Sequence, residues 1–164
     1  MTTEHANGPR RLERTYPATP EEIWELWTTP SGIESWWAPD GFSVEVDELE
    51  LVPGGELVYT MTATAPEQVE FMRNAGMPLA TVSRKTFREV DPPRRLAYDS
   101  LVDFVPDVAQ YEHRTSVDLE PVDAGVRVVM TVEPMHDDVW TERLLAGRSN
   151  ELDNLAAVVA ARRG

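Results

Sequence analysis

The sequence contains no cysteine and only one lysine, Lys85, among its 164 residues. The absence of cysteine excludes disulfides, thiolate nucleophiles and cysteine-ligated zinc, and it fits a cytoplasmic protein. A Schiff-base mechanism would depend on Lys85 alone, which makes that mechanism an unfavoured one. No apolar run approaches the ~18 residues that a membrane span requires, so we predict no membrane insertion.

Positive charge is also scarce, since 15 lysine and arginine residues stand against 29 aspartate and glutamate residues and the formal net charge is −14. A chain this acidic repels phosphate backbones and anionic lipid headgroups, so neither nucleic acid nor a membrane surface is an expected partner. Residues 1–9 are polar and lack the basic and apolar regions of a signal peptide. We predict a disordered tail over residues 1–9, one domain over residues 10–164, and a cytoplasmic location.

Two helix starts follow the first predicted strand, residues 12–16. Residues 19–22 read Thr-Pro-Glu-Glu, in which the threonine can cap a helix, the proline suits its first position and the second glutamate completes a capping box. Residues 29–30 read Thr-Pro and start a second short helix, which Pro39 is expected to end. The apolar face of this second helix is expected to carry Ile33, Trp36 and Trp37.

From residue 42 onward apolar residues alternate with polar ones, which predicts strands. Strands are expected at residues 42–46, 57–61, 84–90, 96–102, 111–120 and 126–132, with Pro-Gly, Pro-Pro or Gly turns between several of them. Residues 63–83 do not fit a strand. We predict a short helix there, from Pro66 to about Gly76, that is either a lid over the sheet or an ordinary long connection.

A long terminal helix is predicted from Asp137 and Asp138, which suit a helix start by capping and by charge, to about Ala161. An antiparallel sheet has one apolar face to cover, and this helix is the only predicted element large enough to cover it. The fold class is therefore α+β: a curved antiparallel sheet of six to seven strands wrapped around a long C-terminal helix, with two short helices after the first strand. We expect an apolar cavity between sheet and helix.

Several motifs in this order resemble the START-like, helix-grip superfamily (SRPBCC), which includes the birch-pollen allergen and polyketide cyclases. The sequence is most similar to the branch named after the C-terminal domain of the heat-shock protein 90 ATPase activator. The similarity covers residues 10–161. It is carried by Ala-Thr-Pro-Glu-Glu-Ile-Trp at 18–24, Trp-Trp-Ala-Pro at 36–39, Pro-Gly-Gly at 53–55, Asp-Pro-Pro-Arg-Arg-Leu at 91–96 and the helix at 147–159. The resemblance implies a helix-grip fold and a cavity for a small apolar ligand, and fold alone does not specify the activity.

The walls of the expected cavity are assigned to aromatic and methionine side chains on the inward faces, because such side chains form adaptable apolar walls. The alternative for each of these residues is an ordinary place in the core. The candidate ligand-binding residues are Trp36, Trp37, Phe42, Tyr59, Met61, Tyr98, His113, Met130 and Trp140.

His113 is the one candidate for chemistry, since it lies on the inward face of its strand and could act as an acid or base near neutral pH. The alternative is a neutral core histidine that is hydrogen-bonded to Tyr98, Tyr111 or a carbonyl. His5 and His136 have no metal-ligand spacing relative to His113, and the glycines at 54–55 form a turn rather than a phosphate loop. We predict no metal and no cofactor.

Three functions are compatible with these observations. The first is binding of a small, mostly apolar or aromatic molecule in the cavity. The second is a cofactor-free enzyme, such as a cyclase, dehydratase or hydrolase, that acts on a carbonyl compound in the same cavity through His113 or a tyrosine. The third is a cochaperone-like interaction module, which only the family resemblance implies. A homodimer is left open.

Overall fold

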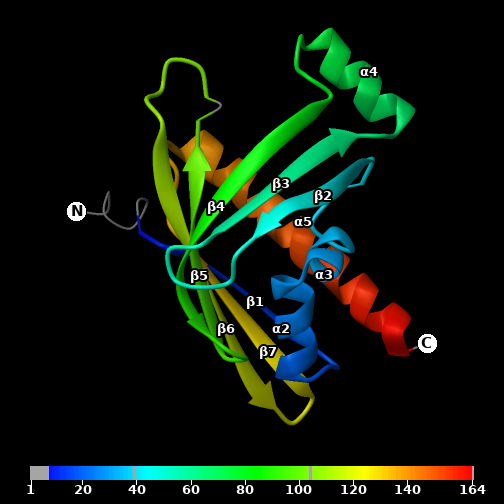
Figure 1. Cartoon of the computed structure of the whole chain (residues 1–164), viewed down its shortest axis with the longest axis vertical. Coiled ribbons are helices and arrows are strands. Elements are labelled where there is room, and N and C mark those ends of the chain that lie inside the picture. Colours follow the sequence, from blue (N-terminus) through cyan, green and yellow to red (C-terminus); the bar gives the residue numbers. More distant parts are fainter. Residues whose placement is uncertain (1–7, 39, 104, 164) are drawn as a thin grey trace.

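The computed structural model describes residues 8–38, 40–103 and 105–163, and its main feature is a seven-stranded sheet crossed on one face by a long C-terminal helix (Figure 1). The strands are β1 (Arg10–Tyr16), β2 (Phe42–Leu49), β3 (Glu56–Ala63), β4 (Ala80–Asp91), β5 (Arg95–Val102), β6 (Tyr111–Val122) and β7 (Gly125–Val132). The helices are α2 (Pro20–Thr28), α3 (Pro30–Glu34), α4 (Pro66–Asn74) and α5 (Asp138–Arg163). The α+β helix-grip prediction is confirmed.

The sheet is antiparallel throughout and has the order β1-β7-β6-β5-β4-β3-β2. Strands β2 to β7 follow one another as neighbours, whereas β1 crosses to the far edge and pairs with β7. The first two strands of the chain therefore lie at opposite edges of the sheet. The helices α2 and α3 form the connection between these two strands (Figure 1).

Both predicted helix starts are present. The Thr19 side chain accepts a hydrogen bond from the backbone N–H of Glu22 at 3.1 Å, and the Glu22 carboxylate accepts one from the Thr19 N–H, which completes the capping box. Thr29 caps α3 by accepting a hydrogen bond from the Gly32 N–H at 3.1 Å. However, α3 ends at Glu34, so the expectation that it carries the next two tryptophans is wrong, and Pro39, the predicted stop, lies outside the described residues.

The connection between β3 and β4 contains the predicted short helix, α4, but residues 80–83 belong to β4 rather than to a loop. The strand pairs with β3 as far as Thr62 and Ala80. The sequence pattern misses this extension because the side chains of residues 80–82 are exposed, so no buried apolar face marks these residues as part of the strand. Figure 1 shows α4 beyond the ends of β3 and β4, at a distance from α5.

The core lies between the inner face of the sheet and α5. β6 shows the predicted alternation, with every second residue from His113 to Leu119 buried. On α5 the buried positions Leu152, Leu155 and Val159 keep helical spacing and form its inner face. The largest fully buried side chains of the described residues include Trp36, Tyr16, Phe87, Met130, Leu152 and Leu155.

Polar contacts fix the position of α5 against the rest of the fold. The Tyr16 hydroxyl at the end of β1 donates to the Leu152 carbonyl at 2.8 Å. The Asn154 side-chain amide donates to the carbonyls of Trp36 and Ala38, at 3.3 and 3.1 Å. Trp36 in turn donates through Nε1 to the Leu26 carbonyl. The two tryptophans after α3 thus join the core without being helical.

Candidate functional site

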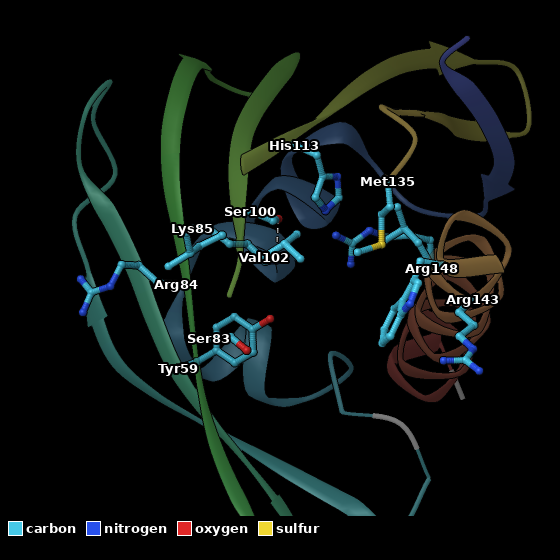
Figure 2. Close-up of a pocket in the computed structure, with 13 residues that line it drawn as sticks. Tyr59, Ser83, Arg84, Lys85, Ser100, Val102, His113, Met135, Arg143 and Arg148 are labelled. Carbon is cyan, nitrogen blue, oxygen red and sulfur yellow. Dashed lines mark hydrogen bonds between the residues drawn. The ribbon is translucent and has the colours of Figure 1, made fainter. Parts of the chain in front are cut away.

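A pocket of about 280 Å³ lies between the sheet and the first half of α5. Its walls come from β3, β4, β5, β6, the segment after β7, and α5 (Figure 2). The lining residues are Tyr59, Ser83, Arg84, Lys85, Ser100, Leu101, Val102, His113, Met135, Trp140, Arg143, Leu144 and Arg148. The pocket is therefore more polar and more basic than the expected apolar cavity.

Lys85 reaches into this pocket from β4. It is two residues before Phe87, which is 1% exposed, so the alternation of the strand directs both side chains inward. Its amine donates to the Ser100 hydroxyl at 2.9 Å, and Ser100 is the cross-strand partner of Lys85 on β5. The side chain is 6% exposed, which is rare for a lysine.

Three aromatic rings surround the Lys85 amine. Its nitrogen lies 5.5 to 5.8 Å from the ring centres of Trp37, Tyr59 and Tyr98. These distances are within the range of cation–π attraction, so the rings favour the charged amine. Trp37 and Tyr59 meet edge to face at 5.3 Å. The rings and Ser100 together hold the amine in one place.

Arg148 reaches into the pocket from α5, opposite the sheet. It precedes Leu152 by one helical turn and therefore shares the buried face of the helix. One guanidinium nitrogen lies 3.2 and 3.3 Å from the two carboxylate oxygens of Glu151, whereas Nε is buried and has no hydrogen-bond partner among the described residues. Figure 2 shows Lys85 and Arg148 entering from opposite walls, with the guanidinium of Arg84 directed away.

The pKa values in the pocket reflect burial beside like charges. Burial, and then the positive charge of Arg148, lower the pKa of Lys85 to about 7, while Glu151 acts in the opposite direction. Burial also acts to lower the pKa of Arg148, but Glu151 and the neighbouring tyrosines outweigh it, so this guanidinium stays charged. Burial raises the pKa of Tyr59, whose hydroxyl therefore keeps its proton.

His113 lines the pocket from β6, on the inward face that the sequence predicts. Burial, and then the charges of Arg148 and Lys85, lower its pKa to about 4. The ring is therefore neutral near pH 7, which suits a hydrogen-bonding role better than acid catalysis. Its Nδ1 is buried and has no hydrogen-bond partner within the described part of the chain.

A second, more open groove of about 430 Å³ adjoins the pocket and shares His113 and Met135 with it. Here the Tyr111 hydroxyl lies 2.7 Å from Nδ1 of His136 and accepts a hydrogen bond from the His136 backbone N–H at 3.1 Å. These contacts hold the segment after β7 against the start of β6.

Of the nine predicted ligand-binding residues, Tyr59, His113 and Trp140 line the pocket. Trp36, Trp37, Tyr98 and Met130 are buried in the core, Met61 packs against it, and Phe42 is half-buried. Trp37 and Tyr98 nevertheless contact the pocket indirectly, through the Lys85 amine. That these nine residues contact a ligand stays a prediction.

The charged residues of the pocket are the ones that sequence reasoning missed. The signals were present in the inward register of Lys85 with Phe87, and in the helical spacing of Arg148 with Leu152 and Leu155. Both were overlooked because a charged side chain in an amphipathic pattern is ordinarily assigned to the solvent face. A cationic residue at an inward position of a strand or helix is the pattern that would have indicated a site.

The match to known families covers most of the chain. Residues 17–160 match the model of the Activator of Hsp90 ATPase homolog 1-like protein family. The chain belongs to this family. The family lies within the START/SRPBCC helix-grip superfamily, as the sequence resemblance implied. No curated protein shows a significant sequence match to the chain.

Solved structures share the fold of this family member at low sequence identity. A Chromobacterium violaceum protein is 22% identical, with a TM-score of 0.73 over 92% of this chain and 96% of its own. The AHSA1 protein of Silicibacter pomeroyi is 22% identical, with a TM-score of 0.74 over 94% and 99%. An AHSA1-like protein of Aeromonas hydrophila is 21% identical, with a TM-score of 0.72 over 94% of each chain.

Two further observations on this family member concern metal sites and membrane-spanning helices. In the described ranges no group of three or more histidine, aspartate or glutamate side chains is arranged to hold a metal ion. Across the same residues no helix is long and apolar enough to cross a membrane. A cytoplasmic location and a homodimer stay predictions.

Proposed function

We propose that the chain binds a small molecule with an apolar body and a carboxylate group in the pocket between the sheet and α5. The observation that carries this proposal is the presence of two buried cationic side chains, Lys85 and Arg148, on opposite walls of one pocket. Small-molecule sites combine apolar walls with a few placed polar groups in this way.

The balance of charge favours an anionic ligand. Buried charges are costly unless they are paired. Lys85 donates to a neutral hydroxyl, and Arg148 shares the carboxylate of Glu151 while its Nε is unpartnered among the described residues. A ligand carboxylate between the two cations would supply the missing negative charge and accept hydrogen bonds from both.

The remainder of the ligand would contact apolar surface. Leu101, Val102, Met135, Trp140 and Leu144 supply that part of the wall. A volume of about 280 Å³ lies near the lower limit of the ~300–1,000 Å³ that is usual for ligand pockets. The ligand is therefore a small acid, such as a short aliphatic or aryl-substituted carboxylic acid, rather than a full-length lipid.

A thermal-shift series tests this proposal, because a ligand that binds only the folded chain raises its melting temperature. Short aliphatic and phenyl-substituted acids are compared with their own primary amides, which keep the shape and lose the charge. We expect the acids to stabilise the protein and the amides to have little effect. Equal stabilisation by an acid and its amide, or none by either, would contradict the proposal.

Variants on one helix give the matched control. Arg148→Met should raise the dissociation constant of the acid by about tenfold or more, since a hydrogen bond to a charged group contributes about 1.5–3 kcal/mol. Arg162→Met removes an equal charge from the exposed end of α5, where Arg162 pairs with Glu25, and should leave the constant unchanged. Equal effects of the two variants would show that only the overall charge matters.

A further inference from the structure

The single lysine of the chain lies in the pocket. Lysine and arginine together number 15, and all except Lys85 are arginine. Apart from the contact of His136 with Asp137, arginines supply the side-chain ion pairs to carboxylates elsewhere in the described structure, as at Arg88 with Asp99 and Arg95 with Asp118. The only side-chain primary amine of the sequence therefore occupies a buried position beside Arg148.

We propose that Lys85 forms an imine with a ligand that carries a ketone or aldehyde in addition to its carboxylate, so that Arg148 holds the carboxylate while the Lys85 amine attacks the carbonyl carbon. This inference rests on the proposed function and makes it more specific: the ligand is a small oxo acid. The sequence disfavoured such a role, and the surroundings of the amine in the folded chain are the reason to revise that view.

The first requirement of this reaction is a neutral amine. An ammonium ion has no lone pair, and an exposed lysine is almost fully protonated at neutral pH. Burial and the positive charge of Arg148 keep a substantial fraction of the Lys85 amine neutral. Desolvation beside a second cation is a known way of activating a lysine as a nucleophile.

The second requirement is a fixed position next to the ligand. The hydrogen bond to Ser100, at 2.9 Å, and the rings of Trp37, Tyr59 and Tyr98 restrict the position of the amine. Lys85 and Ser100 are both part of the pocket lining, so the amine is held at the wall of the pocket. Arg148 on the facing wall then orients the oxo acid by its carboxylate, which is the proximity effect that accelerates such additions.

The chemistry balances without a cofactor. The amine nitrogen bonds to the carbonyl carbon, and the carbonyl oxygen takes up a proton to give a carbinolamine. Loss of that oxygen as water leaves the carbon–nitrogen double bond of the imine, and hydrolysis by one water molecule restores the amine and the oxo acid. Ser100, already hydrogen-bonded to the amine, is placed to accept or return a proton during these steps.

Reductive trapping tests the proposal on the whole protein. The probe is 4-oxopentanoic acid with sodium cyanoborohydride at pH 7.5, and pentanoic acid is the matched ligand without a carbonyl. We expect one adduct, with the mass of the oxo acid less one oxygen atom, and peptide mapping should place it on Lys85. The N-terminal amine is a second site that mapping separates.

Three comparisons decide the outcome. Lys85 should react faster in the folded protein than in the urea-unfolded chain, whereas a purely structural buried lysine would react more slowly when folded. Arg148→Met should slow trapping of 4-oxopentanoic acid by about tenfold or more. It should slow trapping of the methyl ester less, because the ester loses only the effect of the Arg148 charge on the pKa of Lys85. Equal slowing of acid and ester would overturn the orienting role of Arg148.

The binding experiment separates the two proposals. If pentanoic acid stabilises the protein but Lys85 gives no adduct in the folded state, the imine is overturned and the proposed function stands. If neither acid stabilises the protein and no adduct forms, the proposed function itself is overturned. Lys85→Arg should lose only the internal adduct and keep the adduct at the N-terminal amine. Retention of the internal adduct would show that mapping had assigned it wrongly.

Discussion

At the scale of single residues, the pocket lowers the stability of the folded protein. Lys85 and Arg148 are buried cations, and Glu151 is the carboxylate that the structure pairs with Arg148. Side chains of this kind ordinarily stay at the surface, and an apolar replacement of similar volume is often neutral or stabilising. A protein that buries such charges has a less stable fold but gains a binding site, which is the usual trade-off between stability and function.

This cost leads to a pH-dependent prediction for Lys85→Met. The folded pKa of Lys85, about 7, lies below its unfolded value of 10.5, so between these values the unfolded chain binds more protons and the wild type becomes more stable as pH rises. We expect Lys85→Met to be the more stable protein at pH 6, by about 1–4 kcal/mol, and its advantage to shrink towards pH 10.

The measurement is urea unfolding of both proteins at pH 6, 8 and 10, because the difference between them cancels the other titrating groups. Lys85→Arg is the control, since it keeps a charge that does not titrate in this range. A constant difference between wild type and Lys85→Met across the three pH values would show that Lys85 is charged throughout.

At the scale of elements, α4 bears on whether the pocket has a lid. None of the described residues in the range 63–79 belongs to the pocket lining, and Phe71 on α4 is 63% exposed. The backbone N–H of Ala63 donates to the Leu79 carbonyl, which closes the base of the connection. We therefore regard α4 as an ordinary connection with a helix of its own.

Replacing residues 64–78 by Asn-Gly tests this view, because a two-residue turn of this type can join Ala63 to Leu79. We expect a cooperatively folded protein that binds the small acids with unchanged affinity. Circular dichroism and the thermal-shift series are the measurements. A folded variant that binds at least about tenfold more weakly would identify the connection as a lid.

Prediction from the sequence was also most successful at the scale of helices and strands. Local rules correctly predicted the capping box at Thr19, the alternation of β6 and the start of α5, because each depends on residues near one another in the chain. They did not predict the charge of the pocket, which depends on Lys85 and Arg148 lying on opposite walls although they are 63 positions apart in the sequence. Nor did they predict the first residues of β4, whose strand state depends on pairing with β3.

At the scale of the whole molecule, the charge of the pocket is opposite to that of the protein. The net charge is −14, yet the pocket holds Lys85 and Arg148. An anionic ligand is therefore repelled at long range and attracted only once it has entered. Salt screens charges that are exposed and distant far more than charges that are buried and close.

The association rate of a carboxylate ligand should consequently rise with ionic strength. We expect an increase of about two- to threefold between 10 and 150 mM salt, the reverse of an electrostatically steered encounter. Stopped-flow mixing that follows the tryptophan fluorescence near the pocket is the measurement, with the primary amide as the uncharged control. A rate that falls with salt would indicate that the local field of the pocket extends beyond its mouth.

The pairing of β1 with β7 has a consequence for how the protein is made. The first strand of the chain finds its partner only after about 110 further residues have been synthesised, so closing the sheet requires one very long loop. Contacts between residues so far apart in the sequence slow folding. Until these contacts form, β1 and the edge of β7 are open to pairing with strands of other chains. We therefore expect a nascent chain of this protein to be prone to aggregation until β7 has emerged from the ribosome.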